Sequence, residues 1–322
     1  MLKKQRFRSR CNLITIANDK YKIIKKINEG SCGSIYLGKN IQSQETVAIK
    51  IEKQNPKART YLENEYNVYQ TVSGIEGFPK IFHYCEDSKR GKVLIMEVLG
   101  PSLEEMYRFC KKRLTIDATL SFAIQMINRL QVLHSKGYVH CDIKPSNFLT
   151  LPNNNGKFLY LADFGLSKLY RDPETNQHVE FNGNKRFCGT IVFSSIKAFA
   201  EGKQSRRDDM EAIVYTIIYL CKGSLPWQNV HSQHKRQRDE AITEMKTSLA
   251  IHQLCEGLPA EVSVFLQHCR NLEYTEEPSY KYYEGLLFAA IPYKDNSDLS
   301  YPSLHRSLCD SSRSVSMELI SQ

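Results

Sequence analysis

The sequence predicts an α+β fold of two lobes, in which a β-rich first lobe is followed by a helical second lobe. Between Tyr21 and about Leu99, short apolar runs are bounded by turns rich in Gly, Asn or Lys, as is typical of strands. After Gly100-Pro101, apolar residues recur at helical spacing instead. We therefore expect an N-terminal lobe over about 17–98 and a C-terminal lobe over about 102–292.

Four strands and one helix are expected in the first lobe. The helix covers Ala58–Thr71, where Leu62, Tyr66 and Tyr69 recur at helical spacing. The strand candidates are Tyr21–Ile27, Ser34–Leu37, Thr46–Ile51 and Val93–Val98.

Capping and apolar periodicity predict the helices of the second lobe. Ser102 and Glu105 have the spacing of a capping box, which opens a helix through Cys110. A long amphipathic helix follows, with one face marked by Leu120, Ile124, Ile127, Leu130 and His134. Further helices are expected at Asp208–Leu220, Arg238–Thr247 and Ala260–Arg270.

The two ends of the chain differ in composition from the middle. Residues 1–16 begin with several Lys and Arg and no acidic partner, so we expect a basic N-terminal arm. Residues 293–322 are rich in Ser and poor in aromatic residues, which predicts a disordered tail.

Charge and cysteine usage limit the classes of function. The 44 Lys and Arg residues against 35 Asp and Glu give a net charge of +9, which suits a binder of acidic peptides as well as a nucleic-acid binder. The ten cysteines form no CxxC pair, so a zinc site is not indicated. Scattered cysteines favour a reducing compartment, the cytoplasm, the nucleus or both. The longest apolar run, Ile213–Cys221, is too short to span a membrane.

A glycine-containing segment lies between the first two strand candidates. It comprises Asn28, Glu29, Gly30, Ser31, Cys32, Gly33, Ser34 and Ile35. Small residues let a backbone approach phosphate groups closely and offer N–H groups to them. An ordinary hairpin turn is the alternative interpretation. Asn28 stands where the first glycine of the usual pattern would be, and Asn tolerates a positive φ better than most residues.

The strand candidate Thr46–Ile51 contains Val47, Ala48, Ile49 and Lys50. Alternation along a strand puts Ala48 and Lys50 on one face, which would place a small residue beside an adenine and a cation beside its α- and β-phosphates. A solvated strand end is the alternative for Lys50. Glu65 on the following helix could hold the ammonium group, with Glu63 as its rival; the apolar face of the helix favours Glu65.

The strongest signal is the string HCDIKPSN at residues 140–147, followed by Asp163-Phe164-Gly165. Phosphoryl transfer needs a carboxylate to accept the hydroxyl proton, metal ligands, and a cation near the γ-phosphate. Asp142 fits the first role and Lys144 the cation. Asn147 and Asp163 supply the oxygen ligands that Mg²⁺ prefers. Singly these residues would be turn or cap residues, but together they indicate a catalytic site that uses ATP and Mg²⁺.

The order and spacing of these motifs resemble the protein-kinase fold from about Tyr21 to Pro292. Four further strings resemble the casein kinase 1 family specifically: LGPSLE at 99–104, SRRDDME at 205–211, GSLPWQ at 223–228 and KRQR at 235–238. The usual Ala-Pro-Glu is replaced by Ser195-Ile196-Lys197, which is close to the Ser-Ile-Asn of that family.

The resemblance implies a Ser/Thr protein kinase, often constitutively active, with acidic or already phosphorylated protein substrates. It implies that Met96 is the gatekeeper and that Glu97 to Leu99 form the hinge that meets adenine. It also implies that Asp209 braces the catalytic loop. We expect a monomer without a direct nucleic-acid partner.

Two residues depart from the family pattern. Cys141 replaces the Arg that normally pairs with a phosphate on the activation segment, so we expect no such phosphate to be required. Val192 replaces an Arg that helps to bind a priming phosphate, so we expect weaker dependence on priming. The remaining cations for anion binding are Arg238, Lys235, Lys168 and Lys185. The cluster 235–238 has two other interpretations, a solvated helix start or a nuclear localisation signal.

Two other classes of function remain. A pseudokinase that acts as a scaffold is favoured only by Asn28 and Cys141, and the complete set of catalytic residues argues against it. A nucleic-acid-binding protein is favoured only by the net charge of +9.

Overall fold

The computed structural model describes residues 15–30, 33–52, 60–152, 158–180 and 187–291. The chain divides into two compact units: Met1–Ser73 with Pro79–Val98, and Gly74–Phe78 with Leu99–Gln322. The first unit is rich in strands and the second is rich in helices. This division confirms the predicted α+β class.

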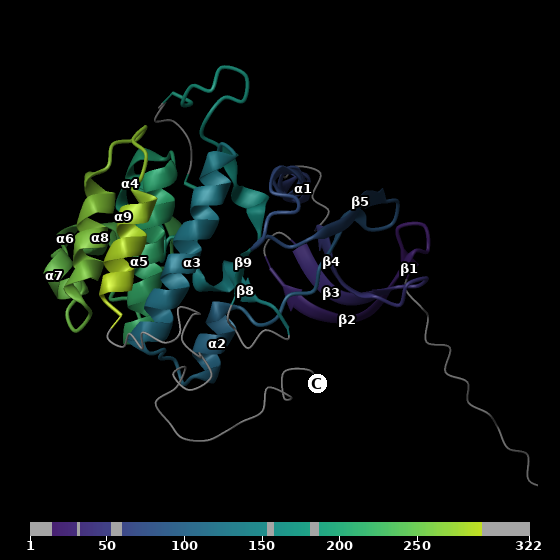
Figure 1. Ribbon diagram of the computed structural model, residues 1–322, viewed down its shortest axis with the longest axis horizontal. Helices are drawn as coiled ribbons and strands as arrows, with labels where there is room; N and C mark the ends of the chain where they lie inside the picture. The colour runs from purple at the N-terminus through teal and green to yellow at the C-terminus, as the bar shows by residue number, and fades with distance from the viewer. Residues whose placement is uncertain (1–14, 31–32, 53–59, 153–157, 181–186, 292–322) are drawn as a thin grey trace, which may run out of the picture. The chain divides into compact units, whose positions relative to one another are not determined.

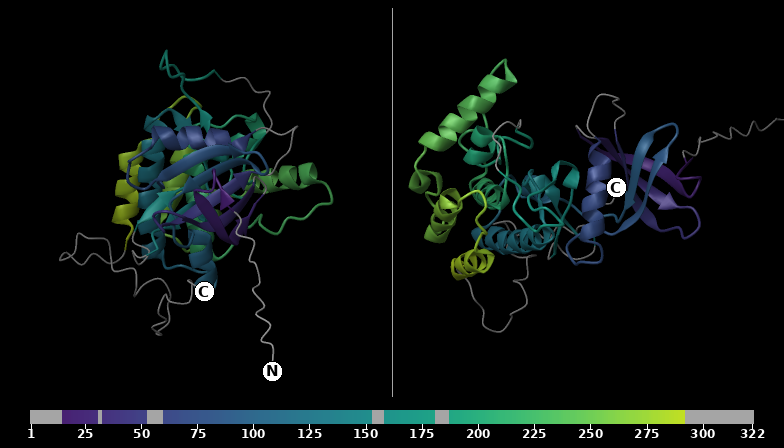
Figure 2. Two further views of the ribbon diagram at one scale, coloured as in Figure 1. Left: turned by 90° about the vertical axis from the view of Figure 1, so that its right-hand side faces the viewer. Right: turned by 90° about the horizontal axis from the view of Figure 1, so that it is seen from above.

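The first unit is an antiparallel sheet in the order β1-β2-β3-β4-β6-β5, with one helix (Figure 1). Its strands are β1 (Thr15–Ile16), β2 (Tyr21–Glu29), β3 (Gly33–Asn40), β4 (Thr46–Glu52), β5 (Ile81–Asp87) and β6 (Gly91–Met96). The helix α1 (Tyr61–Thr71) packs along one face of the sheet, against β4 and β6 (Figure 2, right).

The alternation of β4 separates the core from the face that carries polar groups. Val47 and Ile49 are buried in the core of the first unit, together with Tyr21, Val93 and Ile95. Because successive side chains point to opposite faces of a strand, Ala48, Lys50 and Glu52 lie on the other face.

Several strand predictions need correction. Strand β5 was not expected, because His83 and the polar residues at its end hide the alternation. The strand predicted over Val93–Val98 begins at Gly91 and ends at Met96, and the N–H of Glu97 then donates to the carbonyl of Lys80 at 2.8 Å, outside the β5–β6 ladder. Residues 15 and 16, assigned to the basic arm, form β1. The rest of that arm and the Ser-rich tail lie outside the described residues.

The second unit is built on helices α3 (Ile116–Ser135) and α5 (Arg206–Lys222). Helix α5 is buried from Arg207 to Cys221 and packs against α3 and α8 (Figure 1). The capping box predicted at Ser102 and Glu105 is present at the start of α2. The other helices are α2 (Leu103–Phe109), α4 (Ile196–Glu201), α6 (Lys235–Ser248), α7 (Ile251–Leu254), α8 (Ala260–Asn271) and α9 (Tyr280–Ala289).

Short helices and helix starts were predicted least well. Helices α4, α7 and α9 were not expected, and α6 begins at Lys235 and not at Arg238. Helix α9 contains Gly285 and three tyrosines, which have weak helix propensity, and packing of Tyr283 and Leu287 into the core stabilises it. None of the helices in the described ranges has the length and apolar character of a membrane span.

Two small antiparallel pairs position the loops of the second unit. Strand β7 (Tyr138–Val139) pairs with β10 (Lys168–Leu169), and β8 (Phe148–Thr150) pairs with β9 (Leu159–Leu161). Two 3₁₀ turns, η1 (Pro145–Asn147) and η2 (Phe164–Leu166), connect to these pairs. The predicted catalytic residues lie on the connections.

Candidate functional site

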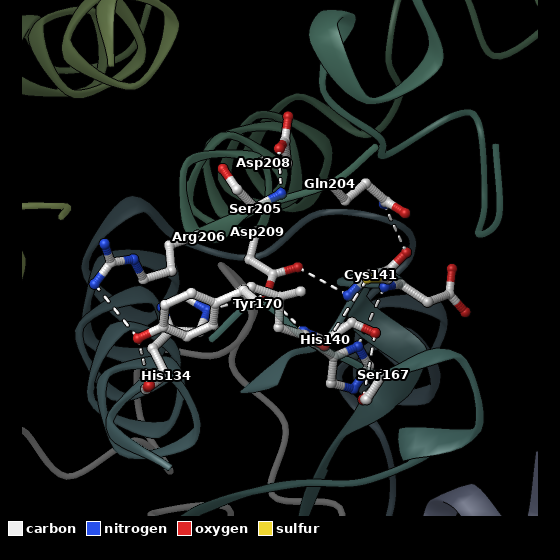
Figure 3. A network of polar contacts seen from close by, with 12 residues as sticks. His134, His140, Cys141, Ser167, Tyr170, Gln204, Ser205, Arg206, Asp208 and Asp209 are labelled. Atoms are coloured by element: carbon white, nitrogen blue, oxygen red, sulfur yellow. Dashed lines mark hydrogen bonds and ion pairs between the residues drawn. The ribbon is translucent and has the colours of Figure 1, made fainter. Parts of the chain in front are cut away.

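The loop from His140 to Lys144 is fixed from below by a carboxylate on α5. One Asp209 oxygen accepts from the His140 N–H at 2.7 Å and the other accepts from the Cys141 N–H at 3.0 Å (Figure 3). His134 on α3 also contacts this carboxylate, at 3.0 Å, and its other ring nitrogen contacts the Tyr280 hydroxyl at 2.8 Å. The brace that the resemblance implied for Asp209 is therefore confirmed.

Cys141 has a left-handed backbone and an apolar surrounding. Its φ is 69°, a region that non-glycine residues rarely adopt; one Asp209 oxygen accepts from its N–H and the Gln204 amide donates to its carbonyl, which holds this conformation. The side chain packs with Val139 and Tyr170. Burial raises the pKa of the Cys141 thiol well above its usual value, so this position carries no charge.

Asp142 is held by two donors, one on each carboxylate oxygen. The Thr190 N–H donates to one oxygen at 2.8 Å, and the Lys144 ammonium donates to the other at 2.5 Å. The same ammonium donates to the Thr190 hydroxyl at 3.1 Å. Asp142 is 8% exposed, so its carboxylate is oriented and still reaches the surface.

Gly189 permits this approach of Thr190 to the catalytic loop. Its φ is +114°, and a Cβ at this position would lie 2.5 Å from the carbonyl oxygen of Cys141. Any side chain there would push the segment away from the loop. Gly189 and Thr190 were not predicted from the sequence, although the Gly-Thr pair itself is a usable signal.

Asn147 and Asp163 lie at the same end of the β8–β9 hairpin. Phe148 pairs with Leu161, and the N–H of Ala162 donates to the Asn147 carbonyl at 3.0 Å. The Asn147 amide nitrogen donates to the Asp142 carbonyl at 2.8 Å, which identifies the nitrogen and leaves the amide oxygen as an acceptor. Asp163 has a left-handed backbone, with φ 68°.

The segment that follows Asp163 packs inward. Phe164 is fully buried, and its ring lies 5.4 Å from that of His140 and 6.1 Å from that of Phe78. These contacts fix the turn η2 directly after Asp163. The position of Asp163 is thus tied to the same loop that carries Asp142.

The segment in place of Ala-Pro-Glu is attached to α5. The Ser195 hydroxyl caps α4 and also donates to Asp208, whose other oxygen accepts from the Ser205 N–H at 2.7 Å. Burial raises the pKa of Asp208 to about 7 against these hydrogen bonds. Hydrogen bonds from Ser195 therefore fix this segment to α5.

In the first unit, Lys50 and Glu65 form a buried ion pair. The Lys50 ammonium lies 2.6 Å from a Glu65 oxygen, and the side chains are 10% and 2% exposed. Glu63, the rival for this role, pairs with Lys92 instead. The choice of Glu65 from the helical face of α1 is confirmed.

The glycine-containing segment forms the β2–β3 connection. The Gly30 N–H donates to the Gly33 carbonyl at 2.8 Å, and a Cβ on Gly33 would lie 2.3 Å from the Ile51 carbonyl oxygen. Only glycine fits there. Ser31 lies outside the described residues. Asn28 lies inside β2 and not at a positive φ, so its tolerance of that conformation is not used.

The residues expected around an adenine lie on the first unit and just beyond it. Ala48 on β4 is opposite Met96 on β6, and Ile35 on β3 is opposite Lys50. Met96 ends its strand at 8% exposure, and the Glu97 side chain accepts from the Lys80 N–H at 3.1 Å. Leu99 is the first residue of the second unit's long segment.

Three of the cations expected to bind anions have no side-chain hydrogen bond or ion pair to another described residue. They are Lys168 on β10 and Lys235 and Arg238 on α6, whereas Arg236 pairs with Glu240. Val192 contributes no charge beside them. Lys185 lies outside the described residues.

The residues present fit ATP and Mg²⁺. Lys50 is held for a phosphate by Glu65, Gly33 is a close-approach glycine, and the Asn147 amide oxygen and the Asp163 carboxylate form a pair of hard oxygen ligands. Within the described ranges, no group of three or more His, Cys, Asp or Glu side chains could hold a metal, so a Mg²⁺ ion would need oxygens from the nucleotide as well.

The comparison with protein families agrees with this geometry. The family model described as "Protein kinase domain" matches residues 21–282, which is most of the chain. Every residue discussed above as catalytic or nucleotide-binding falls within that match.

Proposed function

The chain belongs to the protein kinase domain family and has its two-lobed α+β fold, and from this premise we propose that it is a Ser/Thr protein kinase similar to casein kinase 1. Family membership supports phosphoryl transfer from ATP, usually with Mg²⁺. The class of hydroxyl, the casein kinase 1 likeness and the catalytic competence are our proposal.

The observation that carries the proposal is the arrangement of Asp142. Its oxygens accept from Lys144 and Thr190, and the loop that carries it is fixed by Asp209. A carboxylate held in this way can accept the proton of a substrate hydroxyl, with Lys144 beside it to stabilise negative charge.

The remaining roles follow from the chain's own contacts. Lys50, oriented by Glu65, would bind the α- and β-phosphates, and Asn147 and Asp163 would hold Mg²⁺. Asn28, Gly30, Ser31, Gly33 and Ile35 would cover the phosphates. Bound ATP supplies the γ-phosphoryl group, and Mg²⁺ neutralises its charge.

We further propose that the remaining adenine-side residues are Ala48, Met96, Glu97 and Leu99. Ala48 and Met96 face each other across β4 and β6, so a small and a flexible side chain lie side by side. Glu97 to Leu99 follow the end of β6 and pair with no strand, which is consistent with backbone groups that bind a base.

Constitutive activity is supported by the surroundings of Cys141. The side chain is neutral and packs among Val139 and Tyr170, so it offers no charge to a phosphate on the activation segment. The contact between Thr190 and Asp142 forms without any phosphate, which is what constitutive activity requires. If phosphatase treatment abolished activity and a phosphate on the activation segment restored it, this part of the proposal would be wrong.

Acidic protein substrates are supported by Lys168, Lys235 and Arg238, whose side chains have no partner among the described residues. Val192 supplies none of the charge expected for a priming phosphate. The loss of one charged hydrogen bond costs about 1.5–3 kcal/mol. We expect a weak preference between peptides that differ only in an upstream phosphoserine, and a large preference for the phosphorylated one would contradict the expectation.

We also propose a monomer in the cytoplasm, the nucleus or both, with no membrane or nucleic-acid partner. The alternative function is a pseudokinase that acts as a scaffold, favoured by Cys141 in place of the usual Arg. The Lys50–Glu65 ion pair and the oriented Asp142 argue for the enzyme.

Transfer of labelled phosphate from Mg·ATP to casein tests the proposal. We expect Asp142→Asn to lower turnover by about 10²–10⁴-fold, the contribution of a general base. A wild-type protein as inactive as this variant would make the scaffold function the leading one. Phosphoamino-acid analysis of the product decides whether the acceptor is Ser or Thr.

A further inference from the structure

Helix α6 carries a lysine that is almost completely removed from solvent. Lys246 is 1% exposed, and no carboxylate among the described residues forms an ion pair with it. Its ammonium donates instead to two backbone carbonyls, that of Ile191 at 2.7 Å and that of Ser194 at 2.5 Å. Burying an ammonium group costs free energy unless it is well bound, so this position needs a specific reason for a lysine.

Two aromatic rings complete the surroundings of the ammonium. The Lys246 Nζ lies 4.9 Å from the ring centroid of Tyr215 and 5.1 Å from that of Trp227, within the range of cation–π attraction. Trp227 has a second function, because its indole N–H donates to the Val192 carbonyl at 2.8 Å. Lys246 and Trp227 therefore hold three carbonyls of one short segment.

The segment held in this way begins at Thr190, the residue that contacts the proposed catalytic base Asp142. The N–H groups of Phe193 and Ser194 donate to the Thr190 carbonyl, at 3.0 and 3.1 Å, and close residues 190–194 into a single turn. At the front of this turn, Thr190 contacts both Asp142 and Lys144. At its back, the carbonyls point to Lys246 and Trp227. A shift of the back of the turn would thus change the geometry at Asp142.

A substrate hydroxyl that reaches Asp142 must bring its flanking residues past this turn. Thr190 and Val192 are half-buried and present surface, whereas Ile191, Phe193 and Ser194 are buried. The carbonyls that a substrate backbone could disturb are already bonded to Lys246 and Trp227. The turn is consequently a rigid surface and not a loop that adjusts to each substrate.

We propose that Lys246 is a positioning residue for the protein substrate: it fixes the turn Thr190–Ser194 next to Asp142, so that the chain flanking the target hydroxyl binds a preformed surface. This inference rests on the proposed kinase function. Lys246 touches neither the nucleotide residues nor Asp142, so its effect should be confined to the protein substrate.

The chain offers a matched control for the chemistry of Lys246. Lys222 at the end of α5 also donates to two backbone carbonyls, those of Leu254 and Glu256, each at 3.2 Å. Those carbonyls belong to the end of α7 and the residues after it, not to the turn 190–194. Methionine at either position keeps most of the lysine stem and removes the donors.

Steady-state kinetics with an acidic serine peptide and with ATP test the proposal. For Lys246→Met we expect the KM for the peptide to rise about tenfold, because two hydrogen bonds to the turn are lost, and the KM for ATP to stay within about twofold. Lys222→Met should leave both within about twofold of wild type. An unchanged peptide KM in Lys246→Met, or an equal rise in both KM values, would overturn the proposal.

A second variant keeps the test decisive if Lys246→Met does not fold. Trp227→Phe removes the hydrogen bond to Val192 and part of the buried ring, keeps an aromatic side chain beside Lys246, and should raise the peptide KM by about threefold to tenfold without a change in the KM for ATP. No rise in that variant would also overturn the proposal. A wild-type protein that transfers no phosphate contradicts the proposed function, whereas an active wild type with an insensitive peptide KM contradicts only the role of Lys246.

Discussion

We predict that Glu52 affects the use of ATP, although it is not among the residues expected to contact the nucleotide, because it fixes the start of helix α1. One oxygen of its carboxylate accepts from the N–H groups of Tyr61 and Leu62, at 2.6 and 3.3 Å. These are the first two residues of α1, and the N-cap residue Thr60 makes no side-chain cap bond of its own. Glu52 shares a strand face with Lys50, so β4 holds the helix at its start and again at Glu65.

The size of the effect follows from the cap. Replacing an N-cap acceptor by Ala costs about 0.5–2 kcal/mol. A negative charge at a helix N-terminus contributes a further 0.3–1 kcal/mol or so. We take about 1.4 kcal/mol as the loss for Glu52→Ala, which is a factor of ten in the equilibrium between a helix placed for the Lys50–Glu65 pair and one displaced from it.

The assay is kcat/KM for ATP at saturating casein, with nucleotide affinity measured separately by calorimetry. We expect Glu52→Ala to lower kcat/KM by about fivefold to tenfold and Glu52→Gln, which keeps an acceptor, by less. Glu63→Gln is the control on the same helix, because its ion pair with Lys92 is exposed and should contribute less than about 1 kcal/mol. Equal losses in Glu52→Ala and Glu63→Gln, or no loss in either, would refute the reasoning.

Two further predictions concern charge and pH. Cys141→Arg should destabilise the protein by about 3 kcal/mol or more in urea unfolding, because a large guanidinium would replace a small neutral thiol that is buried against Val139 and Tyr170; a variant as stable as wild type would show that the arginine reaches solvent or a carboxylate such as Asp209. Burial lowers the pKa of Lys246 to about 7, so between pH 7 and the unfolded value of 10.5 the unfolded chain binds more protons and stability rises with pH. The difference in the free energy of unfolding between wild type and Lys246→Met should therefore increase by about 1 kcal/mol per pH unit from pH 7 to 9. If this difference did not change with pH, the pKa of Lys246 in the folded protein would be the ordinary one and the prediction would be wrong.

The residues that we propose to act on a ligand form a local pattern in the sequence. Two short motifs contain Asp142, Lys144, Asn147 and Asp163: HCDIKPSN at 140–147 and Asp163-Phe164-Gly165. The motifs flank the hairpin β8–β9, so residues that are close in space are also close in the sequence. The choice of Glu65 over Glu63 needed only the helical period. The same period failed for α9, where Gly285 and the tyrosines conceal a helix that packing stabilises.

Other parts of the site left no local pattern. Lys246 and Ile191 are far apart in the sequence, and no sequence pattern near either residue predicts their contact. Strand β5 has polar residues at positions that a half-buried strand would fill with apolar ones. The turn chemistry expected for Asn28 was wrong because β2 continues through that residue as extended backbone.

Three charged side chains, each within its own unit, bind backbone groups and not side chains, which explains why no local sequence pattern identifies their partners. Asp209 binds two N–H groups of the catalytic loop, Glu52 binds two N–H groups of α1, and Lys246 binds two carbonyls of the turn after Thr190. Every residue except proline carries both backbone groups, so the partner of such a side chain has no characteristic residue type. A ligand selects side chains by their chemistry and leaves a motif, whereas a backbone partner constrains only where the chain passes. Asp209 was expected only because the chain resembles a known family, whereas Glu52 and Lys246 were identified from the path of the chain, and the substitutions proposed for these two residues test their positioning roles directly.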